Sequence, residues 1–307
     1  MIGNTISIEK GRESVAIVIS IGVNDISVMQ LSNAADVCHL SNYSSFRGNW
    51  RELFVNSAES GIKNPLLQII KNFNGYETEK YYVLLVGSCG LIYKTIDIPV
   101  SVIADEDILS DESIEQLKLI CMSNLPMGYT KTDFAVSVGS MVLSANKMAY
   151  YVNCAYVPKL LVEGIKEMLK ENSLALFDIQ PLAFCIQRAI RLEAPAILDI
   201  ASGYISMTKE GGIIIAKYGS EAVKMQLLDY TKKHTNSILR ANYDFRIITG
   251  HELRNHLKRS LTTMISMADE NWPLVIGAVG ITHWDGDDSK GEKLSDYFEK
   301  VKLIFKR

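Results

Sequence analysis

One nine-residue pattern occurs twice in this chain, once near the N-terminus and once in the second half. The two copies are residues 20–28 (SIGVNDISV) and 199–207 (DIASGYISM). Each follows an apolar, strand-like run, has small or turn-forming residues in its middle, and reaches an Ile-Ser pair at the same offset. The pattern predicts a strand, a tight turn and a second strand in each half of the chain. Two such hairpins that face each other over a cleft can aim backbone N–H groups at a phosphate chain.

The elements predicted around the two copies follow the same order. Around the first copy we predict strands at 15–20, 26–31 and 35–40, a helix at 57–73 and a strand at 81–87. Around the second we predict strands at 196–201, 204–209 and 212–218, a helix at 220–241, a strand at 245–248 and a helix at 251–267. The apolar segment 273–281 fits a strand or a helix. The repeated order βββαβα predicts an α/β, actin-like (ribonuclease H-like) fold with duplicated lobes.

Between the lobes we predict a small inserted subdomain of βαββ type. Its elements are strands at 91–98, 134–142 and 148–156 and a helix that starts near Ser110 and stops before Pro126. A helix at 158–170, a strand at 174–179 and a helix at 181–190 follow. The predicted division is therefore a first lobe at 1–87 and 157–191, the inserted subdomain at 88–156, and a reduced second lobe at 192–307.

Composition restricts the class of protein. The chain has 307 residues, of which 48% are apolar and 22% charged, enough to bury one or two cores. A net charge of −3 and a pI near 6.0 argue against nucleic acid as a partner. Five cysteines, an odd number without a CxxC pair, are typical of reduced core thiols in a cytoplasmic protein. We expect no membrane span and no secretory signal.

Several segments, in order, resemble the PilM family of type IV pilus assembly proteins and the cytoplasmic part of GspL from type II secretion. FtsA is a more distant actin-like relative. The resemblance covers about residues 15 to 285 and is carried by 83–88, 91–99, 160–169, 176–184, 188–189 and 273–281. Each piece is short and apolar, so the order and spacing carry more weight than any one of them.

The resemblance implies a non-enzymatic scaffold at the cytoplasmic side of a bacterial inner membrane, to which it binds peripherally. Such a scaffold would hold the N-terminal peptide of a bitopic pilus or secretion protein and link it to the motor ATPase. By resemblance, the strand Leu91–Ile98 and the insertion up to Tyr156 would form the peptide groove, where strand addition would supply main-chain hydrogen bonds. Which system is served, whether the chain is complete, and whether it forms a homodimer are left open.

The same comparison predicts a degenerate nucleotide cleft. In relatives that hydrolyse ATP the first hairpin resembles DxGxxxxK, whereas this chain has Ser20 and Ser27 at the two end positions. A neutral hydroxyl does not replace the carboxylate that attracts Mg²⁺. In the second hairpin Ala201 and Tyr204 stand where glycine and a small hydroxyl residue are usual. The vestigial cleft residues are Ser20, Gly22, Asn24, Asp199, Gly203 and Gly250; we predict no catalytic residue, no metal site and no cofactor.

Three alternatives remain at this point. Backbone amides hold much of a phosphate, so weak binding of ATP with Mg²⁺ is not excluded by the missing side chains. An actin-like ATPase or a small-molecule kinase would use the cleft for catalysis. A filament former would be identified by polymerisation that depends on protein concentration, whether or not ATP is hydrolysed.

Other candidate sites are weaker. His251 and His256 are five residues apart, where a shared zinc ion on a helix needs four. The acidic turn 285–288 lacks EF-hand spacing. Cys38 and His39 are adjacent on a predicted strand, so their side chains should point to opposite faces. A basic bias in the late second lobe is usually a solvated face, although it could rest on anionic lipid; it comprises Lys232, Lys233, His234, Arg240, Arg246, Arg254, Lys258 and Arg259.

Overall fold

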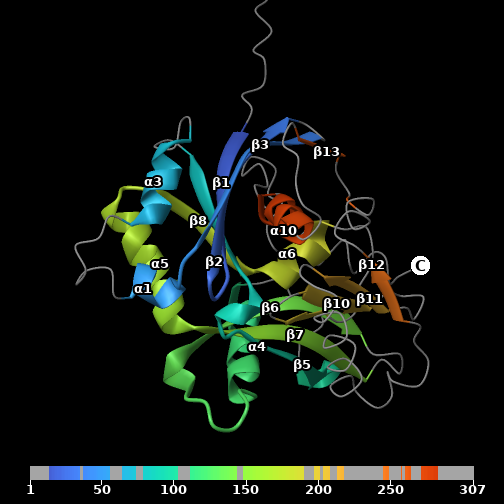
Figure 1. Ribbon diagram of the computed structural model, residues 1–307. Coiled ribbons are helices and arrows are strands. Elements are labelled where there is room, and N and C mark those ends of the chain that lie inside the picture. Colours follow the sequence, from blue (N-terminus) through green and yellow to red (C-terminus); the bar gives the residue numbers. More distant parts are fainter. Residues whose placement is uncertain are drawn as a thin grey trace, which may run out of the picture.

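A computed structural model describes most of the first 190 residues and shorter pieces of the rest. The described residues are 14–34, 37–55, 64–73, 79–102, 111–143, 148–189, 197–200, 203–207, 213–217, 245–248, 257, 260–263 and 271–282. They form three β-sheets with helices packed around them (Figure 1). The architecture is mixed α/β and is consistent with the predicted actin-like fold.

The largest sheet has six strands in the order β13-β3-β2-β1-β4-β8. Their bounds are β1 Ser14–Ile21, β2 Asp25–Ala34, β3 Val37–Arg47, β4 Lys80–Leu85, β8 Ala175–Pro181 and β13 Ser260–Thr263. β1, β2 and β3 form the predicted antiparallel meander, and β4 and β8 run parallel to β1. β13 runs parallel to Val37–Leu40 of β3. A segment from far along the chain therefore closes part of one edge.

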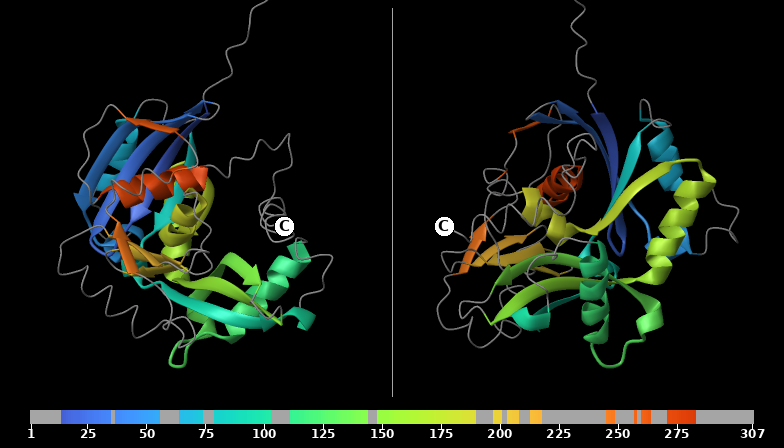
Figure 2. Two further views of the ribbon diagram at one scale, coloured as in Figure 1. Left: turned by 90° about the vertical axis from the view of Figure 1, so that its right-hand side faces the viewer. Right: turned by 180° about the vertical axis from the view of Figure 1, so that it is seen from behind.

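Helices cover both faces of this sheet, which explains why its central strands are nearly continuous apolar runs. Alternate residues of β1 point to opposite faces. Ile17 and Ile19 lie in one buried cluster with α1 (Trp50–Phe54), α3 (Pro65–Lys71) and α5 (Lys159–Glu171). Ala16 and Val18 lie in another with α6 (Leu182–Ala189) and α10 (Trp272–Thr282). Figure 2 shows the resulting three layers, helix, sheet and helix.

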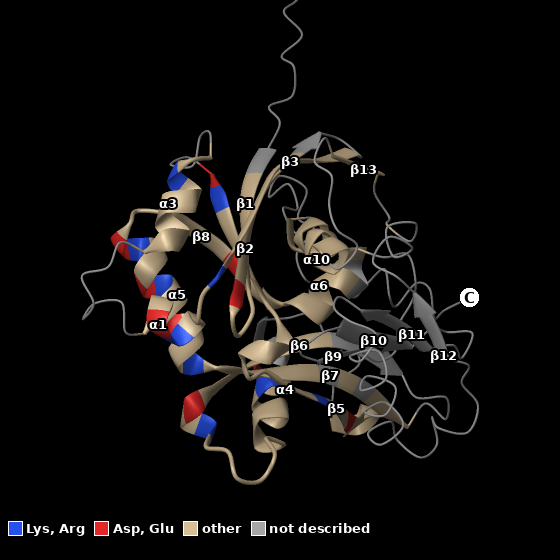
Figure 3. Ribbon diagram, in the orientation of Figure 1, with Lys and Arg blue, Asp and Glu red and all other residues tan. Residues whose placement is uncertain are grey.

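The two helical layers differ in charge. Lys, Arg, Asp and Glu occur along α1, α3 and α5, whereas α10 carries none (Figure 3). On α5 the charged side chains Glu163, Lys166 and Glu167 are exposed, while Leu161 and Ile165 are buried. This amphipathic pattern is typical of an outer layer that has one face in solvent. The α10 side of the sheet is instead an interior layer.

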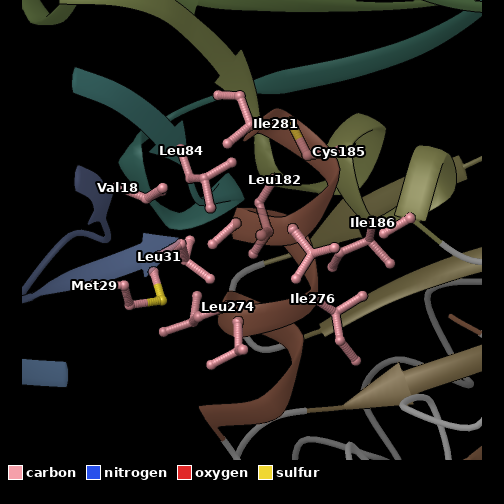
Figure 4. Packing of buried hydrophobic residues seen from close by; sticks show 14 of the residues in the cluster. Val18, Met29, Leu31, Leu84, Leu182, Cys185, Ile186, Leu274, Ile276 and Ile281 are labelled. Carbon is pink, nitrogen blue, oxygen red and sulfur yellow. The ribbon is translucent and has the colours of Figure 1, made fainter. Parts of the chain in front are cut away.

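Every residue of α10 is buried. Side chains of α10 meet those of β2, β4 and α6 (Figure 4). Two glycines set the approach to α6: a Cβ at Gly280 would lie 1.8 Å from the carbonyl oxygen of Cys185, and one at Gly277 would lie 2.3 Å from Cδ1 of Leu182. The sequence pattern of 273–281 was compatible with either a strand or a helix, and the structure shows a helix. Among the described residues, no helix is long and apolar enough to cross a membrane.

A second, three-stranded antiparallel sheet has the order β5-β7-β6. Its elements are β5 Ile92–Pro99, β6 Phe134–Leu143, β7 Ala149–Pro158 and the helix α4 Asp111–Ser123, with short 3₁₀ turns η1 Gly87–Cys89, η2 Val100–Val102 and η3 Lys131–Asp133. Leu117 and Cys121 of α4 pack on one face of the sheet with Ile96, Val152 and Tyr156. The order strand, helix, strand, strand is the predicted one, and the domain boundaries stay predictions.

The third sheet has four strands in the order β12-β11-β10-β9. Their bounds are β9 Ile197–Ile200, β10 Gly203–Met207, β11 Ile213–Lys217 and β12 Phe245–Ile248. β9, β10 and β11 form a second antiparallel meander, as predicted. β12, however, runs parallel to β11, whereas in the first sheet β4 runs parallel to β1. The prediction of duplicated lobes is therefore not confirmed.

The helix predicted over 251–267 is wrong at 260–263, where the chain forms β13. Ser260 is exposed, Leu261 is buried and Thr262 is exposed, which is the two-residue period of a half-buried strand. The unpaired edge of β3 supplies hydrogen-bond partners that a sequence pattern does not reveal. Both β13 and α10, which the predicted boundary at 192 assigned to the second lobe, pack on the first sheet.

Candidate functional site

The first predicted phosphate-binding turn joins β1 to β2. The N–H of Gly22 donates to the carbonyl oxygen of Asp25 at 2.8 Å, which closes the turn. The carbonyl oxygen of Asn24 accepts from the N–H of Gly48 at 2.9 Å, so the residue after β3 also holds it. The turn is therefore tight, and the Gly22 N–H, which the prediction assigned to phosphate binding, is bonded within the turn itself.

Ser20 and Ser27 flank this turn and face each other across the β1–β2 ladder. Their side chains are 2% and 4% exposed. The hydroxyl of Ser27 is hydrogen-bonded to the hydroxyl of Tyr43 at 3.2 Å. The position at which the sequence comparison expects the magnesium-binding carboxylate of an ATPase is thus occupied by a buried neutral hydroxyl, which offers no charge to a hard cation.

A turn from elsewhere in the chain is bonded to the first hairpin. The N–H of Val23 donates to Oγ of Ser88 at 3.1 Å. The carbonyl oxygen of Ile21 accepts from the N–H of Val86 and from the thiol of Cys89, both at 2.9 Å. The residues that follow β4 therefore engage the tip of the hairpin, where the predicted site needed free N–H groups. Sequence reasoning missed Ser88 and Cys89, whose only signal is their place after a buried strand.

The second predicted turn has a different register from the first. Asp199 in β9 pairs with Tyr204 in β10, and Ser206 pairs with Ile197. In the first hairpin the residue at the position of Asp199 is Ser20, which pairs with Ser27. Two residues lie between β9 and β10, so the second turn is shorter than the first. Equal spacing in the sequence thus does not give equal geometry in the two hairpins.

Both predicted hairpins contact the short helix η1. β9, which carries Asp199 and leads to Gly203 at the start of β10, contacts η1, and η1 is hydrogen-bonded to the first hairpin. Gly250, the remaining predicted cleft residue, lies outside the described residues, as do the histidine pair of 251–256 and the acidic turn 285–288.

Cys38 and His39 do not form a catalytic pair. Cys38 is buried in the core, whereas the Nδ1 atom of His39 is hydrogen-bonded to the hydroxyl of Thr262 in β13. The prediction that these two side chains point to opposite faces is confirmed. Within the described ranges, no group of three or more His, Cys, Asp or Glu is placed to hold a metal ion.

The inserted subdomain is docked on α6 through one aromatic ring. Phe184 of α6 packs edge-on against Tyr93 of β5, with ring centroids 5.9 Å apart. A Cβ at Gly139 of β6 would lie 2.7 Å from the Phe184 ring, so the backbone of β6 also approaches this ring closely. The hydroxyl of Ser137 also donates to Oε1 of Gln180 in β8 at 3.4 Å. These contacts bring β6 beside the end of β8.

Two edge strands meet at this junction. β6 is an edge strand of the inserted sheet and β8 is an edge strand of the first sheet. Residues 134–139 of β6 are all half-buried, and Phe177 of β8 is 46% exposed. Edge strands present N–H and C=O groups to which an extended peptide can pair. β5, the edge predicted from the sequence, is also an edge strand, but it contacts β9.

Comparisons with known proteins give little beyond this geometry. No protein-family model matches the chain, and no curated protein matches it. Among solved structures, one that matches is described as a "PilM-PilN type IV pilus biogenesis complex", with a TM-score of 0.48 and 11% sequence identity over 88% of this chain and 98% of that chain. At that score and identity, the likeness carries no inference about function.

Proposed function

We propose that this protein is a non-enzymatic scaffold of a type IV pilus or type II secretion machine. It binds the N-terminal cytoplasmic peptide of a bitopic inner-membrane protein and links that protein to the motor ATPase. Its place is then the cytoplasmic face of the inner membrane, where the partner peptide holds it. The resemblance of short segments to the PilM family is the reason for naming a pilus or secretion machine. The contacts of the first hairpin support the non-enzymatic part of the proposal, and the edge of β6 supports the peptide-binding part.

The geometry of the first hairpin supports the non-enzymatic part of the proposal. Catalysis of phosphoryl transfer requires a bound divalent cation and preorganised donors around the transferring group. Here Ser20 is neutral and buried, and the N–H of Val23 is already bonded to Ser88. A phosphate at this turn would have to displace the Ser88 hydroxyl without help from a metal held by the hairpin.

The free edge of β6 supports the peptide-binding part, and it is the observation on which the proposal mainly rests. Within the described residues, β7 is the only strand paired with β6, so its other edge is available for strand addition. The edge lies beside β8 at the Ser137–Gln180 hydrogen bond. A peptide added there would contact both the first sheet and the inserted subdomain, and side chains on either side would select its sequence.

Proline substitution on β6 tests this proposal. In an antiparallel edge strand, successive N–H groups point alternately to the neighbour and outward. One of the two variants Ala135→Pro and Val136→Pro therefore removes only an outward donor and should keep the fold. That variant is titrated with fluorescent peptides from the N-termini of bitopic pilus and secretion proteins, and fluorescence anisotropy is recorded. We expect the parent to bind one peptide and the folded proline variant to bind it at least about tenfold more weakly.

A matched control places proline on another edge. Ser44→Pro and Ser45→Pro form the equivalent pair on β3, whose outer edge beyond Leu40 has no partner strand among the described residues. The member of that pair that keeps its fold should bind peptide like the parent. Equal affinity for the folded β6 variant and the parent, or no binding of any such peptide by the parent, contradicts the proposal.

A further inference from the structure

Two thiols face each other inside the inserted subdomain. Cys121 of α4 and Cys154 of β7 are 0% and 1% exposed and belong to the same buried cluster. The two thiols lie within hydrogen-bonding reach of each other. The thiol of Cys154 also donates to the carbonyl oxygen of Lys94 on β5 at 3.5 Å. The pair thus joins α4 to the central strand of the sheet of this subdomain.

Further hydrogen bonds hold the last turn of α4 over these thiols. The hydroxyl of Tyr156 donates to the carbonyl oxygen of Cys121 at 2.7 Å, and Nζ of Lys94 donates to the carbonyl oxygen of Asn124 at 2.7 Å. Tyr156 is two residues after Cys154, so both side chains lie on the same face of β7. The position of Cys121 over Cys154 is therefore fixed by bonds from two adjacent strands and does not depend on the thiols themselves.

The two thiols are chemically different. The hydrogen bond from Cys121 lowers the pKa of Cys154 against the opposing effect of burial, and the nearby Lys94 ammonium acts in the same direction as the hydrogen bond. The same bond, together with burial, raises the pKa of Cys121. A thiol with a lower pKa is ionised to a larger extent at neutral pH, and the thiolate is the form that attacks a disulfide. This division of roles is that of a dithiol pair able to close into a disulfide.

We propose that Cys121 and Cys154 form a reversible disulfide that locks α4 onto the inserted sheet, with a low-molecular-weight disulfide as the oxidant. The Cys154 thiolate attacks one sulfur of the oxidant and releases one small thiolate, which leaves a mixed disulfide. Cys121 loses its proton to solvent, attacks the Cys154 sulfur, and releases the second small thiolate. Two protein thiols and one small disulfide thus give one protein disulfide and two small thiols.

Burial sets the conditions under which this exchange runs. Because both thiols are inaccessible, α4 must lift transiently from the sheet before the oxidant can reach Cys154. The hydrogen bond from Cys121 is lost in that opened form, and the Lys94 ammonium on the adjacent strand is the group that still favours the Cys154 thiolate. The S–S bond of about 2.05 Å is shorter than the thiol–thiol hydrogen bond, so α4 and β7 are drawn together when it closes. The oxidised form therefore holds α4 more firmly than the reduced form. This holds whether or not the protein is a pilus or secretion scaffold.

The test uses the full chain and glutathione as the probe. The reduced protein is incubated under native conditions with increasing ratios of oxidised to reduced glutathione, free thiols are alkylated, and peptides are mapped by mass spectrometry. We expect one dominant cross-linked peptide joining Cys121 to Cys154, its loss on addition of dithiothreitol, and slower amide hydrogen exchange in residues 111–123 of the oxidised form. Cys121→Ala and Cys154→Ala should each abolish the cross-link, and Cys89→Ala should retain it.

Three results would overturn the proposal. They are a cross-link between other cysteines, a cross-link that forms only in denaturant, or a stable glutathione adduct on Cys154 that Cys121 does not resolve. Unchanged hydrogen exchange in α4 after the cross-link has formed would refute the locking effect. The mapping of the parent protein needs no variant, so it decides the question even where an alanine variant fails to fold.

Discussion

Substitution of Gly280 by alanine in α10 tests how the last described helix completes the core of the first sheet. The added Cβ would lie 1.8 Å from the carbonyl oxygen and 2.7 Å from the carbonyl carbon of Cys185 in α6. These are backbone atoms, so no rotamer change of a side chain relieves the overlap. An ordinary carbon–oxygen contact needs at least about 3.2 Å, so the two helices must separate by roughly 1.5 Å.

The cost follows from that separation. A gap of about 0.5–1 Å already loses a quarter to a half of the dispersion attraction between facing groups. Overpacking a well-packed core typically costs about 1–3 kcal/mol, and more where the backbone must move. Alanine regains about 1 kcal/mol over glycine through helix propensity. We therefore expect Gly280→Ala to lower the free energy of unfolding by about 2 kcal/mol, a large part of the total stability of a typical domain.

Gly277→Ala is the matched control on the same helix. Its Cβ would lie 2.3 Å from Cδ1 of Leu182, the end of a flexible side chain that can rotate away. The net change should be about 1 kcal/mol or less, because the helix-propensity gain offsets most of the repacking. Urea unfolding followed by tryptophan fluorescence measures both variants, because Trp50 of α1 and Trp272 of α10 are both buried in the folded protein. Equal stability of Gly280→Ala and Gly277→Ala would refute the close backbone contact between Gly280 and Cys185.

Three smaller perturbations test the hydrogen bonds and the one described carboxyl with a shifted pKa. Ser88→Ala should lower the unfolding free energy by about 0.5–1 kcal/mol in urea titrations, because the Val23 N–H loses its acceptor, and an unchanged midpoint contradicts the bond. Tyr156→Phe should cost about 1 kcal/mol and speed hydrogen exchange in the last turn of α4, whereas unchanged exchange there rules out the Tyr156–Cys121 bond. Partial burial raises the pKa of Glu79 above its ordinary value of 4.5, so its stabilising contribution is full below that value and is lost as pH rises through the raised pKa. Glu79→Gln should therefore gain stability relative to the parent as the pH of thermal melts rises from about 4 to 7, and parallel curves argue against the shift.

Local patterns in the sequence predict much of the first sheet. The run 81–87 is apolar at nearly every position, and the corresponding strand β4 is buried on both faces. The spacing of Leu117 and Cys121 predicts one apolar helix face, and α4 places both on the inserted sheet. In these elements, the local pattern and the tertiary environment agree, since each side chain is buried by its nearest neighbours in the fold.

Prediction fails where a distant strand or helix decides the outcome. Residues 260–263 form a strand because the edge of β3 offers partners more than 200 residues away in sequence. The segment 273–281 has no periodicity that separates strand from helix, and only burial on all sides identifies α10 as an interior helix.

The candidate site shows the same limit. Ser20 and Gly22 are found at the first hairpin, as the repeat predicts. The hydrogen bond from the Val23 N–H to Ser88 joins residues 65 positions apart. It could not be predicted, because no local sequence pattern marks a serine that accepts such a bond. The register of the second hairpin was also hidden, because the same Ile-Ser offset permits turns of two different lengths.

Titration calorimetry of the purified full chain with Mg·ATP tests most directly the claim that the protein is a scaffold and not an enzyme. Ser20 is neutral and buried, so the first hairpin has no carboxylate at position 20, and its Val23 N–H is already bonded to Ser88. We expect only the heat of dilution, at protein and nucleotide concentrations that would reveal a dissociation constant of about 1 mM. Saturable heat with one nucleotide per chain would contradict the account, and turnover of that nucleotide would show the protein to be an enzyme.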